Sequence, residues 1–177
     1  MTTLQHWISG ARPRTLPAAI APVLVGSAIA YQEHSFKPAL ALLALVVALG
    51  MQIGVNYSND YSDGIRGTDD VRIGPVRLVG QKLAAPNAVK TAALIFYGVG
   101  AFAGLGMVAI SGYWQLIPVG ILAVLSGWFY TGGPRPYGYA GFGELFVFVF
   151  FGLVAVIGTS APQTGTVSVT AILAAGE

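Results

Sequence analysis

The chain contains apolar runs that are far longer than a soluble domain needs. No Asp, Glu, Lys or Arg interrupts residues 91–134 or residues 145–176. A helix that crosses a bilayer requires about 20 mostly apolar residues. Charged residues make up 9% of the chain, whereas a typical soluble domain has about 25%. These runs predict an all-α fold, in the form of a polytopic transmembrane helical bundle.

The spans of this bundle can be placed along the chain. The runs are too long for strands and lack the alternating segments of roughly 10 residues that form a transmembrane β-barrel. Gly100 and Gly104, four residues apart on the third run, indicate close packing against another helix. We expect five complete spans and the start of a sixth, at residues 15–32, 38–57, 88–110, 114–131 and 144–160 and from about residue 167.

Basic residues fall almost entirely on one side of the predicted membrane. Of the nine Lys and Arg residues, only Lys37 lies in a connection on the other side. Because Lys and Arg in short loops mark the cytoplasmic face, we predict a multi-pass protein of the cell inner (plasma) membrane with a cytoplasmic N-terminus. The loop after the second span is then cytoplasmic too. The expected surrounding is the lipid bilayer; no nucleic-acid partner is indicated, and no oligomeric state is predicted.

An acidic cluster follows the second apolar run directly, in the stretch VNYSNDYSDGIRGTDD (residues 55–70). If the second span continues as a helix, Asn56, Asp60 and Asp63 lie within about 60° of one another, and Asn59 lies at the edge of that face. Magnesium prefers one or two carboxylates together with phosphate oxygens of a substrate. The spacing therefore predicts an oxygen-rich face that can hold a hard cation.

A simpler interpretation also exists for this stretch, because Asn and Asp are common in turns and caps. For Asp69 and Asp70 we favour that interpretation. Asn56 and Asp60, in contrast, follow the apolar run without a spacer. An acid near the bilayer centre costs about 2.5–3.5 kcal/mol on insertion scales, and such acids usually mark a site. We therefore expect a function for the earlier residues of the cluster.

The stretch GVNYSNDYSDGIRGTDDVRIGPVRLVG (residues 54–80) closely resembles the first metal motif of the UbiA-type intramembrane prenyltransferases. Segments 11–26, 72–79 and 130–152 resemble the menaquinone branch of that family. The wider superfamily often has the pattern Asn-x-x-x-Asp-x-x-x-Asp, which would place an acid at position 64. This chain has Gly64 there, and Asp63 suits the Asn-Asp-x-x-Asp form of the branch.

The resemblance implies transfer of a polyprenyl group from polyprenyl diphosphate to 1,4-dihydroxy-2-naphthoate, which gives demethylmenaquinone. It implies Mg²⁺ as cofactor, with Asp60, Asp63 and Asn56 as catalytic residues and Asn59 as a further metal ligand. The family fold has nine helices and a second acidic motif after the sixth. Residues 1–177 are therefore expected to be one transmembrane prenyltransferase domain, truncated at its C-terminus and inactive alone.

The resemblance also suggests substrate-binding residues. Arg72, Arg77 and Lys82 follow the acids and could bind the diphosphate, although a positive cytoplasmic flank needs no substrate. Tyr130, at the end of the fourth span, could line the pocket or belong to an interfacial aromatic belt. Arg135 stands where many superfamily members have a basic residue, and it could meet the carboxylate of the acceptor.

Two other functions remain open from the sequence. The segment DYSDG matches the opening of the CDP-alcohol phosphotransferase motif, but Gly67 and Thr68 stand where that family needs Ala and Arg. A transport or binding protein is the other alternative, because polar residues inside membranes also mark ion pathways. Such a pathway would place polar residues at mid-depth on several spans, whereas here they gather at one end.

Overall fold

Every regular element in the described part of the chain is a helix. The structure is a computed structural model that describes residues 2–68 and 76–176. The long helices and the short helical turns between them have these bounds: α1 Leu4–Gly10, η1 Pro13–Thr15, α2 Leu16–Gln32, α3 Pro38–Arg66, α4 Pro86–Ser111, α5 Leu116–Phe129, η2 Tyr137–Ala140, α6 Gly143–Val147, η3 Phe148–Val154, α7 Ala155–Thr164 and α8 Val169–Ala174. The predicted all-α class is confirmed.

Four helical segments are long and apolar enough to cross a membrane: Leu4–Gln32, Pro38–Arg66, Pro86–Ser111 and Gly143–Thr164. They correspond to the predicted first, second, third and fifth spans. The predicted fourth span is shorter in the structure, because α5 has 14 residues and is about 21 Å long at 1.5 Å per residue. Its start is delayed by the turn after α4, where Gly112 adopts the left-handed conformation with φ 71°.

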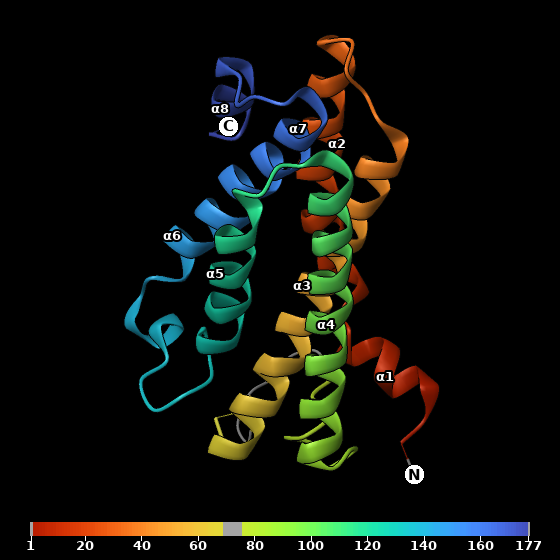
Figure 1. Cartoon of the computed structure of the whole chain (residues 1–177). Coiled ribbons are helices and arrows are strands. Elements are labelled where there is room, and N and C mark those ends of the chain that lie inside the picture. Colours follow the sequence, from red (N-terminus) through yellow and green to blue (C-terminus); the bar gives the residue numbers. More distant parts are fainter. Residues whose placement is uncertain (1, 69–75, 177) are drawn as a thin grey trace.

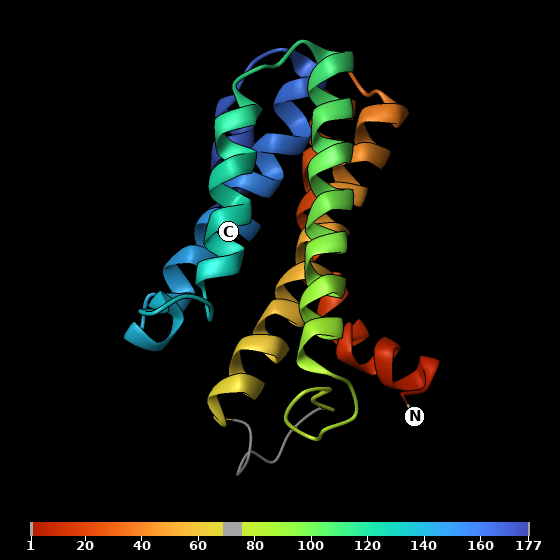
Figure 2. The same ribbon diagram turned by 60° about the horizontal axis from the view of Figure 1, so that its bottom comes forward.

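The helices α3 and α4 lie side by side along most of their length (Figures 1 and 2). Glycines allow this close approach. A Cβ atom on Gly50 of α3 would lie 2.9 Å from the backbone nitrogen of Gly100 and 2.9 Å from the carbonyl oxygen of Phe96, both on α4. The predicted packing role of Gly100 is confirmed, since small residues let helix backbones meet in membranes.

The other helices flank this pair. α2 packs against α3 and α7, and α5 packs against α4 and α3. The end of α3, the start of α4 and the short helix α1 lie at one end of the molecule, whereas α8 lies at the opposite end (Figure 1). We call the first of these the acidic end, because it holds Asp60 and Asp63.

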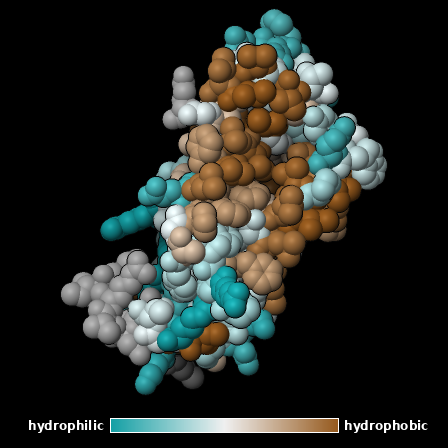
Figure 3. All heavy atoms as spheres, turned by 90° about the vertical axis from the view of Figure 1, so that its left-hand side faces the viewer, coloured by the Kyte–Doolittle hydropathy of each residue, from teal (hydrophilic) through white to brown (hydrophobic). Residues whose placement is uncertain are grey.

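The surface matches a bilayer environment. In Figure 3, hydrophobic side chains gather over the middle and upper part of the visible face, and hydrophilic side chains gather towards its two ends. Large apolar side chains are exposed on α4, α5 and α6, and they include Phe102, Leu105, Ile121, Leu122 and Leu145. Exposed apolar patches of this extent indicate contact with lipid or with another apolar surface. The chain is a multi-pass membrane protein.

The fifth span contains a π-helical segment that the sequence did not predict. η3 has hydrogen bonds from residue i to i+5 over Phe148–Val154, between the α-helical segments α6 and α7. Next to it, Phe146 packs against Tyr137 with ring centroids 4.1 Å apart and against Phe150 with centroids 6.1 Å apart. An aromatic row therefore joins this span to the connection after α5.

Candidate functional site

The acidic face is built by an uninterrupted helix. α3 continues as far as Arg66 and ends at Gly67, which adopts the left-handed conformation (φ 72°) of a helix cap. The helix therefore extends beyond the predicted second span (residues 38–57), which is the condition on which the predicted oxygen-rich face depends. Asn56, Asp60 and Asp63 are all buried, with 3%, 1% and 6% of their surface exposed.

Asn56 faces the N-terminal segment. Its side-chain amide donates to the carbonyl oxygen of Ala11 at 2.9 Å and to Thr15 Oγ1 at 3.0 Å. Its Oδ1 accepts from Gln52 Nε2 at 3.4 Å. The asparagine thus holds the turn between α1 and α2 against α3.

Asp60 faces the backbone of the loop that precedes α4. Its Oδ2 accepts from the Leu78 N–H at 2.8 Å, and its Oδ1 accepts from the Val79 N–H at 3.0 Å. Two amide donors compensate for the burial of this carboxylate, as a buried charge requires. The Arg77 and Arg12 guanidinium groups also lie near enough to attract it electrostatically.

Asp63 lies one turn further along and joins two other parts of the chain. Arg77 Nη1 is 3.7 Å from its Oδ2, and the Tyr139 hydroxyl donates to its Oδ1. Burial, and after it the adjacent Asp63 carboxylate, raise the pKa of Tyr139 above its usual 10. The phenol therefore remains a hydrogen-bond donor at physiological pH.

The connection after α5 is also tied to the end of α3. Thr131 Oγ1 donates to Asn59 Oδ1 at 2.8 Å. Arg66 donates to the carbonyl oxygens of Thr131 and Gly133, and its guanidinium lies 5.9 Å from the centre of the Tyr139 ring. The acidic end thus brings together the N-terminal segment, the loop before α4 and the connection after α5.

Several residues of this end were not predicted as part of the site, and they include Arg12, Arg66, Thr131 and Tyr139. In the sequence, the two arginines indicated only the orientation of the chain in the membrane. Arg66 follows Asp63 at i+3, so its place on the same helix face was readable. Nothing in the local sequence marks Thr131 or Tyr139, since each reaches α3 only through the tertiary fold.

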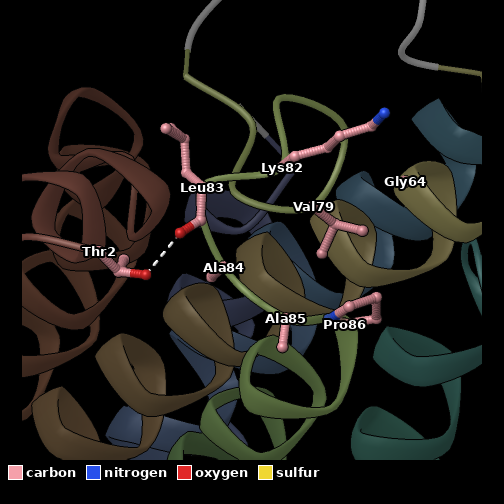
Figure 4. A pocket seen from close by; sticks show the side chains of 8 residues that line it. All are labelled: Thr2, Gly64, Val79, Lys82, Leu83, Ala84, Ala85 and Pro86. Carbon is pink, nitrogen blue, oxygen red and sulfur yellow. Dashed lines mark hydrogen bonds between the residues drawn. The ribbon is translucent and has the colours of Figure 1, made fainter.

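The predicted substrate-binding residues are divided between several places. Arg77 lies in the site. Lys82 is exposed in a turn with φ 55°, where it lines a hollow beside the loop (Figure 4). Tyr130 lies at a different hollow with Glu144 and packs against Tyr137, and Arg135 is exposed. Arg72 lies outside the described residues, as do Asp69 and Asp70.

The donor set of the acidic face suits a hard cation. Among the described residues no three His, Asp or Glu side chains lie close enough to hold a metal. Magnesium needs only one or two carboxylates when substrate phosphates supply more oxygens. Within residues 2–68 and 76–176, each oxygen of Asp60 and Asp63 has at least one protein partner, and a carboxylate offers about four acceptor positions in all. The metal ligands Asn56, Asn59, Asp60 and Asp63 stay a prediction.

The fold and site define a class of protein, an apolar helical bundle with two buried aspartates and the buried Arg77 at one end. The chain belongs to the UbiA prenyltransferase family, because the sequence pattern of that family matches residues 19–176. This confirms the resemblance seen in residues 54–80. It also decides against the CDP-alcohol phosphotransferase and transport-protein alternatives.

Known proteins similar to this chain come from bacteria and animals. It is 59% identical to the 1,4-dihydroxy-2-naphthoate octaprenyltransferase of Mycobacterium tuberculosis over 163 residues, which cover 92% of this chain and 56% of the relative. It is 37% identical to the Escherichia coli protein of the same name, over 97% of this chain and 58% of the relative. It is 30% identical to the UbiA prenyltransferase domain-containing protein 1 of Gallus gallus, over 94% of this chain and 50% of that relative. The chain thus spans about half the length of these relatives.

Proposed function

We propose that the protein carrying this chain transfers a polyprenyl group from polyprenyl diphosphate to 1,4-dihydroxy-2-naphthoate. The observation that carries the proposal is the buried cluster of Asp60, Asp63 and Arg77 at the end of an apolar bundle in a chain of the UbiA family. The names of the bacterial relatives support the acceptor and the polyprenyl donor. An apolar bundle in a bilayer suits a substrate with a long hydrocarbon tail.

The charges of the cluster suit a diphosphate head group. Arg77 would bind phosphate oxygens through its fork of N–H donors, and Arg12 lies near enough to add a second positive charge. Asp60 and Asp63, with Asn56 and Asn59, would hold Mg²⁺. When bound, Mg²⁺ supplies Lewis-acid stabilisation of the negative charge on the leaving diphosphate.

The proposed reaction begins with cleavage of the allylic C–O bond, whose electrons leave with the diphosphate. The allylic cation is then attacked by the ring carbon that bears the carboxylate of the acceptor. Loss of that carboxylate as CO₂ restores the aromatic ring. The product is a prenylated naphthoquinol, the reduced form of demethylmenaquinone. Arg77 would stabilise the developing charge of the diphosphate, as preorganised donors do in transition states.

We further propose that the acidic end faces the cytoplasm and that the membrane is the cell inner (plasma) membrane. Support comes from the basic residues, because Lys and Arg mark cytoplasmic loops. Arg12, Arg66 and Arg77 lie at the acidic end of the described structure. A cytoplasmic site is open to a water-soluble acceptor.

The test is a transfer assay on membranes that contain the full-length gene product. Membranes would receive Mg²⁺, octaprenyl diphosphate and ¹⁴C-ring-labelled 1,4-dihydroxy-2-naphthoate, and lipid-soluble label would be counted. We expect activity that excess chelator abolishes and that Asp63→Asn lowers by orders of magnitude. Lys37→Gln serves as the charge-changing control, because Lys37 is exposed at the end of α3 opposite the acidic end. Arg135→Gln tests the predicted contact with the acceptor carboxylate. No transfer by the unaltered protein, or full activity of Asp63→Asn, would overturn the proposal.

A further inference from the structure

The loop before α4 rests on α3 at a position where no side chain fits. A Cβ atom on Gly64 would lie 2.5 Å from Val79 Cβ, 2.5 Å from Val79 Cγ1 and 3.1 Å from the Gly80 nitrogen. Real Cβ atoms do not approach other atoms so closely, so any side chain at position 64 would push the loop away. Figure 4 shows Val79 beside Gly64 at the edge of the hollow.

A second glycine bounds the same loop on its other side. A Cβ atom on Gly10, at the end of α1, would lie 2.8 Å from Leu78 Cδ1. Leu78 has no exposed surface. The N-terminus adds a hydrogen bond from Thr2 Oγ1 to the Leu83 carbonyl (Figure 4). The loop is thus enclosed between α1 and α3.

The place of this contact explains its importance. Gly64 lies one turn after Asp60, whose carboxylate receives the N–H groups of Leu78 and Val79. The residue just before these amides is Arg77, which is 7% exposed and pairs with Asp63. Asp60 can receive both amides only when Val79 is in contact with α3. That contact requires that position 64 has no Cβ atom.

We propose that Gly64 is a positioning residue of the polyprenyl diphosphate site. The absence of a Cβ atom at position 64 lets the turn formed by residues 77–79 pack against α3, an arrangement that we call seating. The seated turn holds the Arg77 guanidinium beside Asp63. The inference rests on the proposed function for its substrate, but the seating itself is a property of the fold. It also gives a physical reason for glycine at a position where the wider superfamily often has an acid.

Seating can be measured in the full-length gene product without the enzyme reaction. Residues 1–177 contain no cysteine, and any cysteine elsewhere in the gene product would first be replaced by Ser. Leu78→Cys places one thiol in the buried turn, and its labelling by a maleimide in permeabilised membranes reports how often the turn leaves α3. Gly64→Ala in this background should raise the labelling rate about 5- to 150-fold, from the usual 1–3 kcal/mol cost of overpacking. Adding Val79→Gly, which removes the colliding atoms, should restore slow labelling.

The matched control is Gly98→Ala on α4, where no atom lies within 4 Å of the added Cβ. It should leave labelling unchanged, as should Val79→Gly alone within a few-fold. Equal labelling of the Gly64→Ala protein and its parent would overturn the seating. So would fast labelling that Val79→Gly fails to slow.

The role of Gly64 in the diphosphate site is tested by enzyme kinetics. Three variants of the full-length gene product, without the Leu78→Cys change, are compared with the unaltered protein: Gly64→Ala, Gly64→Ala/Val79→Gly and Gly98→Ala. Gly64→Ala should raise KM for polyprenyl diphosphate at least about tenfold and leave KM for the naphthoate within twofold, and Val79→Gly should reverse the change. Equal effects on both KM values, or none, would overturn the positioning role. Absence of prenyl transfer by the unaltered protein would instead refute the proposed function, and the thiol assay would still decide the seating.

Discussion

Asp60 offers the most quantitative test of how the acidic end is assembled. Its two carboxylate oxygens each receive one backbone amide, at 2.8 Å from Leu78 and 3.0 Å from Val79. Asp60→Asn changes few atoms and keeps the side-chain volume. It leaves one acceptor oxygen, but the other becomes an NH₂ group that faces an N–H donor. One of the two buried amides therefore loses its partner.

The magnitude follows from the chemistry of that one bond. A hydrogen bond to a charged acceptor contributes about 1.5–3 kcal/mol, and a buried donor left unpaired costs a similar amount. At about 1.4 kcal/mol for each factor of ten, the seated state of the 77–79 turn should lose about 10- to 150-fold in population relative to the open state. Replacement by Leu, which removes both acceptors, should cost more.

The assay is maleimide labelling of Leu78→Cys, since labelling follows the open population when opening and closing are fast. Glu144→Gln removes the same charge from an exposed position and is the control, for which we expect no change. If Asp60→Asn labelled at the rate of its parent, the two amides would not depend on the carboxylate. The contact of residues 77–79 with α3 would then have a cause other than Asp60.

Three further predictions follow from other parts of the structure. Gly50→Ala should lower the free energy of unfolding by about 1–3 kcal/mol through overpacking, because its Cβ atom would lie 2.9 Å from the α4 backbone. Thermal unfolding in detergent measures this loss. The control Gly120→Ala, whose Cβ atom has no other atom within 4 Å, should show no change. An impermeant thiol reagent should label Lys37→Cys but not Gln81→Cys in intact cells, and the reverse pattern would invert the proposed orientation. Tyr139→Phe should lower the rate of prenyl transfer about tenfold, which is the effect of one hydrogen bond to a charged acceptor. The loss should be the same at pH 7 and at pH 9, because the raised pKa of Tyr139 keeps its hydroxyl protonated below pH 10. A loss that becomes smaller towards pH 9 would contradict a donor role.

Local geometry along one helix was accessible from the sequence. The 3.6-residue period placed Asn56, Asp60 and Asp63 on one face, and the structure buries all three. Their partners were not accessible. Asp60 receives backbone amides, which every residue has, from a loop 18 and 19 positions later. Tyr139 reaches Asp63 across 76 positions, and no spacing rule predicts such a contact.

The apolar runs predicted the positions of the spans better than the length of each span. Hydropathy located the helices well, because burial of apolar residues in a bilayer depends on composition. It overestimated the fourth span, since Gly112 and the turn that follows it end one helix and delay the next. Hydropathy also carries no signal for a π-helical turn, which depends on how the backbone bonds rather than on which residues are apolar.

The π-helical segment η3 divides the fifth span into two lengths with separate rotational phases. Each residue taken up by a wider turn offsets the α-helical faces on its two sides by about 100°. On one side, Phe146 meets Tyr137 in the connection after α5. On the other side, Val156 packs into a cluster with Ile29 of α2. A helical wheel drawn over Gly143–Thr164 as one unbroken α-helix would therefore assign the wrong neighbours to the residues on one side of η3.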